Sequence, residues 1–141
     1  MSALDALPHG PEFRFVDEIT ELEGGKRALG RYTVRGDEAF LAGHFPGNPL
    51  MPGVILLEAI AQLGGVAAQS DPEIPAVEGL LLTGIRGAKI LGAAVPGEVL
   101  EISATVEGRL GPMIQIGGEV KVGERVLATA KVQLAGASSA E

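Results

Sequence analysis

A glutamate near the middle of the chain has the setting of a general acid. Glu58 stands in an apolar run from Val54 to Leu63, and its polar companion is Gln62, four residues later on the same face of a helix. An ionised carboxylate in an apolar site is costly unless it is paired, so such groups usually keep a proton near neutral pH, as a general acid must. The alternative is that Glu58 reaches solvent at an edge or pairs with a lysine or arginine.

A histidine fourteen residues earlier could supply the matching base. His44 lies in GHFPGNPLMPG, residues 43–53, where three prolines and three glycines fix a stiff and irregular path. It is the only side chain of this segment that titrates near neutral pH. The alternative is that His44 is a hydrogen-bonded surface residue.

The start of the helix lies between this base and this acid. Unpaired N–H groups at Gly53 and Val54, together with the positive end of the helix dipole, suit a carbonyl oxygen that gains negative charge. One base, one acid and one oxyanion site therefore fall within a single stretch of sequence.

The elements that must position these groups are one helix and a set of strands. Pro52 suits a first helical turn, and Gly53–Gln69 is apolar on nearly every side, so this helix must be enclosed. Hydrophobic residues alternate with polar ones in the last third of the chain and, less regularly, earlier. The predicted strands are 13–22, 27–35, 80–91, 100–106, 114–122 and 126–134, with turns at Gly24-Gly25 and Gly123-Glu124. This pattern predicts an α+β fold in which an antiparallel sheet curls around one helix.

Composition limits the classes of function. The length of 141 residues predicts one domain over 1–136, followed by a frayed tail over 137–141. A net charge of -7 and few aromatic residues argue against nucleic acid and membrane surfaces as partners, and charged residues near the start argue against a signal peptide, so we expect a cytoplasmic protein. The chain has no cysteine, its two histidines, His9 and His44, lack metal-ligand spacing, and no phosphate or dinucleotide loop occurs, so no metal or cofactor is expected.

The run HFPGNPLMPGVILLE, residues 44–58, continued by AIAQ, closely resembles the signature of the (3R)-3-hydroxyacyl-acyl-carrier-protein dehydratases of type II fatty acid synthesis. The opening Leu7-Pro8-His9 and the turn Val95-Pro96-Gly97-Glu98 also resemble that family, so the likeness covers nearly the whole chain. Two arginines expected before this turn are absent, which leaves room for a role in related lipid or polyketide synthesis.

The resemblance implies a hot-dog fold and a dehydration that yields a trans-2-enoyl thioester. His44 would be the base and Glu58 the acid, the thioester oxygen would accept the Gly53 N–H, and Val54 would lie beside it. The supporting residues would be Phe45, Pro46, Gly47, Met51, Pro52 and Gln62.

The resemblance also implies partners. The substrate would arrive on the phosphopantetheine arm of an acyl carrier protein, for which Arg86 and Lys89 are candidate docking residues unless they are simply solvated strand residues. The family's two catalytic residues come from different subunits, so we expect a homodimer, which can assemble further as a trimer of dimers. The alternatives are a hot-dog thioesterase, which would need a carboxylate-activated water, and a non-catalytic acyl-binding subunit.

Overall fold

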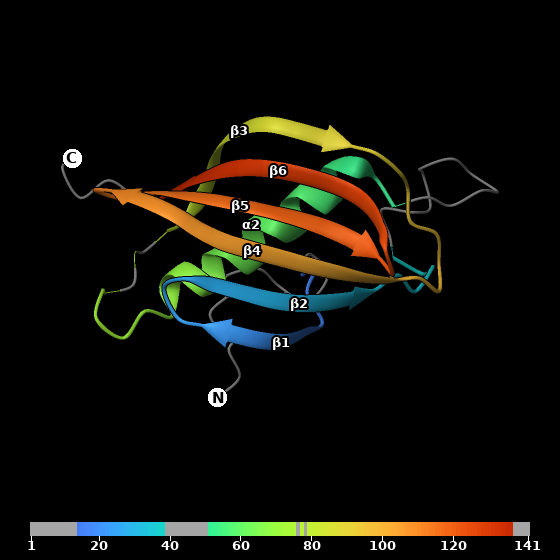
Figure 1. The fold of residues 1–141 in the computed structure, drawn as a ribbon, viewed down its shortest axis with the longest axis horizontal. Helices are drawn as coiled ribbons and strands as arrows, with labels where there is room; N and C mark the ends of the chain where they lie inside the picture. The colour runs from blue at the N-terminus through green and yellow to red at the C-terminus, as the bar shows by residue number, and fades with distance from the viewer. Residues whose placement is uncertain (1–13, 39–50, 76, 78, 137–141) are drawn as a thin grey trace.

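One antiparallel sheet dominates the fold. The computed structural model describes residues 14–38, 51–75, 77 and 79–136, and within them six strands are hydrogen-bonded in the order β1-β2-β4-β5-β6-β3. Figure 1 shows β1 and β2 along one edge of this sheet and β3 along the other. The strands are β1 Glu18–Glu23, β2 Arg27–Thr33, β3 Leu81–Ile90, β4 Val99–Leu110, β5 Met113–Val122 and β6 Arg125–Ala135.

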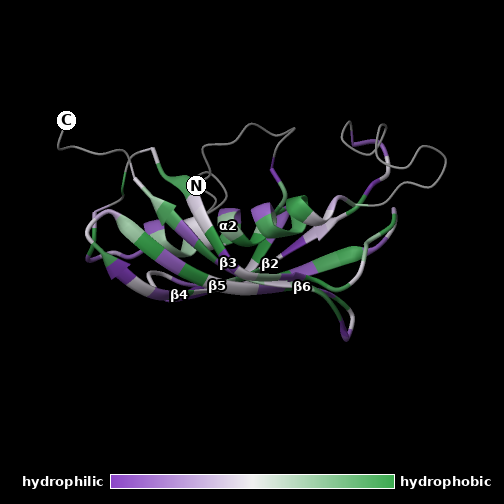
Figure 2. Ribbon diagram, turned by 90° about the horizontal axis from the view of Figure 1, so that it is seen from above, coloured by the Kyte–Doolittle hydropathy of each residue, from purple (hydrophilic) through white to green (hydrophobic). Residues whose placement is uncertain are grey.

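The helix α2, Gly53–Gln69, crosses one face of the sheet (Figure 1). Seen along the sheet, the strands curve and α2 lies on their concave side (Figure 2). Eleven of its 17 residues are buried, because the helix is apolar on nearly all sides and only the curved sheet can cover that much surface. At its far end Arg109 of β4 donates to the carbonyl oxygen of Ala68, which places a cation at the negative end of the helix dipole.

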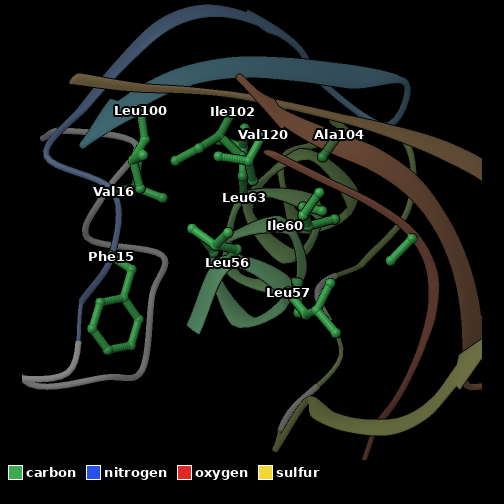
Figure 3. Close-up of a cluster of buried hydrophobic side chains, with 14 of the residues drawn as sticks. Phe15, Val16, Leu56, Leu57, Ile60, Leu63, Leu100, Ile102, Ala104 and Val120 are labelled. Atoms are coloured by element: carbon green, nitrogen blue, oxygen red, sulfur yellow. The ribbon is translucent and has the colours of Figure 1, made fainter. Parts of the chain in front are cut away.

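Side chains from α2 and the concave face of the sheet form the core (Figure 3). Along β4 the residues alternate between the core and solvent, as period-2 patterning requires. The helix contributes Leu56, Leu57, Ile60 and Leu63, and the strands contribute Leu100, Ile102, Ala104 and Val120.

Two glycines let α2 lie close to the middle of the sheet. A Cβ on Gly64 of the helix would stand 2.5 Å from Ile116 Cγ2 of β5, and a Cβ on Gly118 of β5 would stand 2.6 Å from Ile60 Cγ2 of the helix. Each glycine receives a branched side chain from the opposite element. This interlocking fixes the distance between helix and sheet and thereby the position of the helix start.

Most predicted elements are confirmed. The helix bounds are those expected from the sequence, and the predicted turns lie between β1 and β2 and between β5 and β6. The first strand differs, because it begins at Glu18 rather than at position 13. Phe15 and Val16 are both buried in succession, which a half-exposed strand does not allow, and the Asp17 carboxylate accepts the Thr33 N–H at 2.8 Å. The chain therefore bends at Asp17 before pairing begins.

The edge strand β3 is exposed along most of its length. Its large apolar side chains are among those that reach solvent: Leu81 is 68% exposed, Ile85 45% and Ile90 50%. An exposed apolar edge strand of this kind either binds another chain or promotes aggregation. None of the described helices is both long enough and apolar enough to span a bilayer.

Candidate active site

The chain enters α2 through a fixed connection. Met51 is buried and donates its N–H to the carbonyl oxygen of Ala94 at 2.8 Å, and Pro52 occupies the N-cap position. The Ile55 N–H turns back to the Pro52 carbonyl oxygen at 3.0 Å. The helix has no side-chain cap hydrogen bond and no acidic residue in its first turn, so the positive end of its dipole is not neutralised by its own side chains.

The two predicted oxyanion donors stand at this helix start. Gly53 lies against β3, since a Cβ there would be only 2.7 Å from Ile90 Cδ1 and 3.0 Å from Ile90 Cγ2. Val54 points away from the core and is 68% exposed. Intrahelical bonding leaves the N–H groups of a first turn without partners, so this position suits an accepting carbonyl oxygen.

The structure brings Glu58 and Gln62 together as their spacing predicts. Gln62 Nε2 donates to Glu58 Oε2 at 3.2 Å, and Gln62 Oε1 accepts the main-chain N–H of Phe15 at 2.8 Å. Glu58 is half-buried, whereas Gln62 is only 2% exposed and is the buried polar side chain recorded among the described residues. A carboxyl group is therefore held in a defined orientation on the first two turns of α2.

A polar cluster, made of Asp17, Tyr32, Arg35 and Glu38, lies beyond Phe15. The Phe15 ring meets the Tyr32 ring edge-on, with centroids 6.0 Å apart and planes at 73°. The Tyr32 hydroxyl donates to Glu38 Oε2 at 2.7 Å, and the Arg35 guanidinium lies 5.2 Å from the centre of the Tyr32 ring and 3.5 Å from Asp17 Oδ1.

Hydrogen bonding sets the charge of this cluster. Burial raises the pKa of Glu38, but donation from the Arg35 N–H, the Tyr32 hydroxyl and the Gly36 N–H outweighs it and lowers the pKa overall. Burial, followed by the hydrogen bond to Glu38, raises the pKa of Tyr32. Glu38 is thus an anion and Tyr32 a neutral donor at neutral pH.

Sequence reasoning missed Phe15, Tyr32 and Glu38. A signal existed for Tyr32, because it occupies an inward position of its strand with Ala28, and a buried hydroxyl needs a partner. Phe15 takes part through its main-chain N–H, which no residue type reveals.

Four of the predicted site residues, His44, Phe45, Pro46 and Gly47, lie outside the described residues. Within the described ranges, no three histidine, aspartate or glutamate side chains are grouped so that they could hold a metal ion.

Arg86 and Lys89 lie on the convex face of the sheet, away from α2. Arg86 Nη2 donates to Gln115 Oε1 at 3.3 Å, and Gln115 stands between the buried Ile114 and Ile116, so it points outward. Lys89 lines a shallow depression on this face with Lys131 and Glu107, among other residues. The structure therefore separates both residues from the helix start within one copy of the chain.

Comparison with known proteins agrees with these features. A family model described as a FabA-like domain matches residues 7–131. The 3-hydroxyacyl-(acyl-carrier-protein) dehydratase FabZ of Caldanaerobacter subterraneus subsp. tengcongensis is 40% identical over 126 residues, which cover 89% of either chain. The FabZ dehydratase of Chloroflexus aggregans is 48% identical over 101 residues, 72% of this chain and 69% of that relative.

A solved structure shows the same architecture. The dehydratase heterocomplex ApeI:P from Xenorhabdus doucetiae superposes with a TM-score of 0.82 at 19% identity, covering 100% of this chain and 94% of that chain. The hot-dog arrangement predicted from the sequence, a sheet wrapped around one helix, is thereby confirmed.

Proposed function

The chain belongs to the FabA-like family, and from this membership we propose that it dehydrates (3R)-3-hydroxyacyl thioesters, carried by an acyl carrier protein, to trans-2-enoyl thioesters. The observation that carries the proposal is a relative named as such a dehydratase, 40% identical over 89% of the chain. An oriented carboxyl group on the central helix supports it. A thioesterase and a non-catalytic acyl-binding subunit are not favoured by these relatives.

The proposed reaction divides the proton transfers between two residues. His44 removes a proton from C2 of the acyl chain, the electrons of that bond form the C2=C3 double bond, and the C3–O bond breaks. Glu58 gives its proton to the departing hydroxyl, which leaves as water. Acid and base groups of this kind each contribute about 10²–10⁴-fold.

The start of α2 supports the first proton transfer. Removal of a proton from C2 places negative charge on the thioester oxygen, so the reaction needs donors at that oxygen. We assign this role to the N–H groups of Gly53 and Val54, since the first turn lacks an acidic side chain that would repel the charge.

We propose further that the working form is a homodimer in which His44 of one subunit faces Glu58 of the other. The exposed edge strand β3 supports this, because strand pairing with a second copy would cover its apolar side chains. Ile90 of this strand touches the start of α2 at Gly53, so a partner on this edge would stand next to the candidate site. Three such dimers could assemble into a larger particle.

The acyl carrier protein is the proposed partner, with Arg86 and Lys89 as candidate contacts. Carrier proteins are acidic, and these two cations stand on the same strand near Lys131. Arg86 and Lys89 are both exposed, and their partners on β6 are the exposed Lys131 and the half-buried Thr129, so the two cations are open to a protein of opposite charge.

The experiment is incubation of the purified protein with a short and a long 3-hydroxyacyl carrier thioester, following enoyl product by mass. Glu58→Gln and His44→Ala should each lower turnover by about 10²–10⁴-fold. Glu101→Gln, on an exposed position of β4, is the matched control and should keep full turnover. Absence of enoyl product from both substrates, with a folded protein, would contradict the proposed function.

A further inference from the structure

The connection between β3 and β4, residues 91–98, holds the start of α2. Met51 supplies the last main-chain donor before the helix, since Pro52 has no N–H, and it donates to the carbonyl oxygen of Ala94 at 2.8 Å. Met51 is 2% exposed and Ala94 is fully buried, so water cannot readily replace this bond. Ile90, at the end of β3, fills the space next to Gly53. The position of the first helical turn therefore depends on where the connection places Ala94.

A tight turn forms the end of this connection. Val95 accepts the Glu98 N–H at 3.1 Å. Pro96 and Gly97 stand between them, and Gly97 has the positive φ, 97°, that a type II turn requires at its third position. The Gly97 N–H donates to the carbonyl oxygen of Val34 at 2.7 Å, and the Glu98 carbonyl oxygen accepts the Val34 N–H at 3.0 Å. The turn is thereby joined to the residue that follows β2.

The Glu98 side chain acts on a single peptide group of this connection. Its Oε1 accepts the Val95 N–H at 2.9 Å. This N–H belongs to the same planar peptide group as the Ala94 carbonyl that binds Met51. Glu98 Oε2 accepts Arg125 Nη2 at 2.9 Å, but Arg125 is 56% exposed, so this ion pair contributes little. The carboxylate and the Met51 N–H therefore bind opposite edges of one rigid plane.

From this geometry we propose that Glu98 is a positioning residue for the proposed oxyanion site at Gly53 and Val54. A peptide plane that is bound at both edges cannot rotate freely, so the carboxylate sets the direction in which the Ala94 carbonyl meets Met51. Its negative charge strengthens the bond to the N–H and, through the polarised peptide group, the bond at the carbonyl. This inference rests on the proposed function, because the oxyanion site belongs to that reaction.

The test compares two substitutions of similar shape. Both Glu98→Gln and Glu98→Met remove the charge, but only the glutamine keeps an oxygen for the Val95 N–H. Glu98→Met should lower kcat about 10-fold or more with a smaller change in KM, because misplaced donors lose stabilisation of the transition state above all. Glu98→Gln should keep kcat within about 5-fold of the wild type, since an exposed ion pair contributes little. Glu21→Met breaks another exposed ion pair, to Arg27 at 3.0 Å, and is the control that should keep full kcat.

A second measurement reports on the donors themselves. Hydrogen bonds from Gly53 and Val54 lower the stretching frequency of the thioester carbonyl, which infrared difference spectra record with a 3-hydroxyacyl carrier thioester that is isotope-labelled at that carbonyl. The slow Glu58→Gln variant keeps the bound substrate intact for the measurement. Adding Glu98→Met should move the frequency toward that of the free thioester, whereas adding Glu98→Gln should not. Hydrogen exchange at the Met51 N–H should speed up in Glu98→Met alone.

A pair of glycine variants covers the case in which Glu98→Met does not fold. Gly97→Ala strains this turn through its positive φ, and Gly111→Ala strains the turn between β4 and β5 in the same way; a Cβ meets nothing within 4 Å at either position. Gly97→Ala should lower kcat and Gly111→Ala should not. With an active wild type, equal kcat in the two Glu98 variants, an unmoved carbonyl frequency or an unchanged kcat in Gly97→Ala overturns this inference alone. A wild type without dehydratase activity overturns the proposed function.

Discussion

The Glu38 carboxylate offers the sharpest test of the polar cluster. Its side chain is 5% exposed; Oε1 accepts the Gly36 N–H at 2.7 Å, while Oε2 accepts the Tyr32 hydroxyl at 2.7 Å and the Arg35 N–H at 3.0 Å. Glu38→Gln keeps the shape but has only one oxygen. The amide must therefore turn its NH₂ group toward at least one of these donors.

Of the two orientations of the new amide, the one that costs less stability places its oxygen toward Tyr32 and its NH₂ group toward Gly36. An N–H left without its acceptor costs about 1–3 kcal/mol, and exposure of Gly36 brings this to the lower end because water can replace part of the bond. The two remaining bonds lose their charge assistance. Glu38→Gln should therefore lower the free energy of unfolding by about 1–2 kcal/mol at pH 7.

Urea unfolding at fixed protein concentration measures this difference in the free energy of unfolding. Repeating the measurement at several pH values shows whether the difference grows or shrinks in acid. The pKa of Glu38 is lowered in the folded protein, so its stabilisation is complete above the unfolded value of about 4.3 and is lost as the pH falls through the folded value. The gap between wild type and Glu38→Gln should shrink on acidification. Glu101→Gln, at an exposed strand position, should show no such gap. Equal urea midpoints at pH 7, or a gap that grows in acid, would refute the reasoning.

Two further outcomes are expected. Gly118→Ala should lower the free energy of unfolding by about 3 kcal/mol in urea, because its Cβ would collide with the main-chain oxygen of Ser103; Gly108→Ala, with nothing within 4 Å, is the control and should lose nothing. Mixing inactive His44→Ala and Glu58→Ala proteins under conditions of subunit exchange should restore activity to about a quarter of the sites, because half of the dimers are mixed and each has one intact site. Confirmed exchange without recovered activity would place both residues of a site on one chain.

Local patterns were sufficient to predict the helix and most strands. Pro52 marks the start of α2, and a mostly apolar run, interrupted by Glu58 and Gln62, carries it to Gln69. Alternation of apolar and polar residues defines β4, β5 and β6, because each has one face on the core.

The remaining features depend on contacts distant in sequence. Val16 follows Phe15 without a polar residue between them, and the chain bends at Asp17, whose carboxylate accepts the main-chain N–H of Thr33 in the next strand. The contact between Glu58 and Gln62 follows from their spacing on one helix, whereas the Phe15 N–H reaches Gln62 from 47 positions away. Nothing in the local pattern of residues 80–91 specifies that their neighbour is the last strand.

The strand order has a consequence for how the chain can fold during synthesis. β3 is synthesised directly after α2, yet it pairs with β6, so Leu81 has no strand partner until Ala135 has been synthesised. At roughly 5–20 residues per second, the apolar edge of β3 and the buried face of α2 stand uncovered on a ribosome for a few seconds. The sheet must therefore be completed late and cooperatively, when β4, β5 and β6 have been synthesised, pair in series as a meander and cover the helix together. A chain truncated before β6 would retain the residues of the candidate acid and its glutamine while lacking the strand that completes their enclosure.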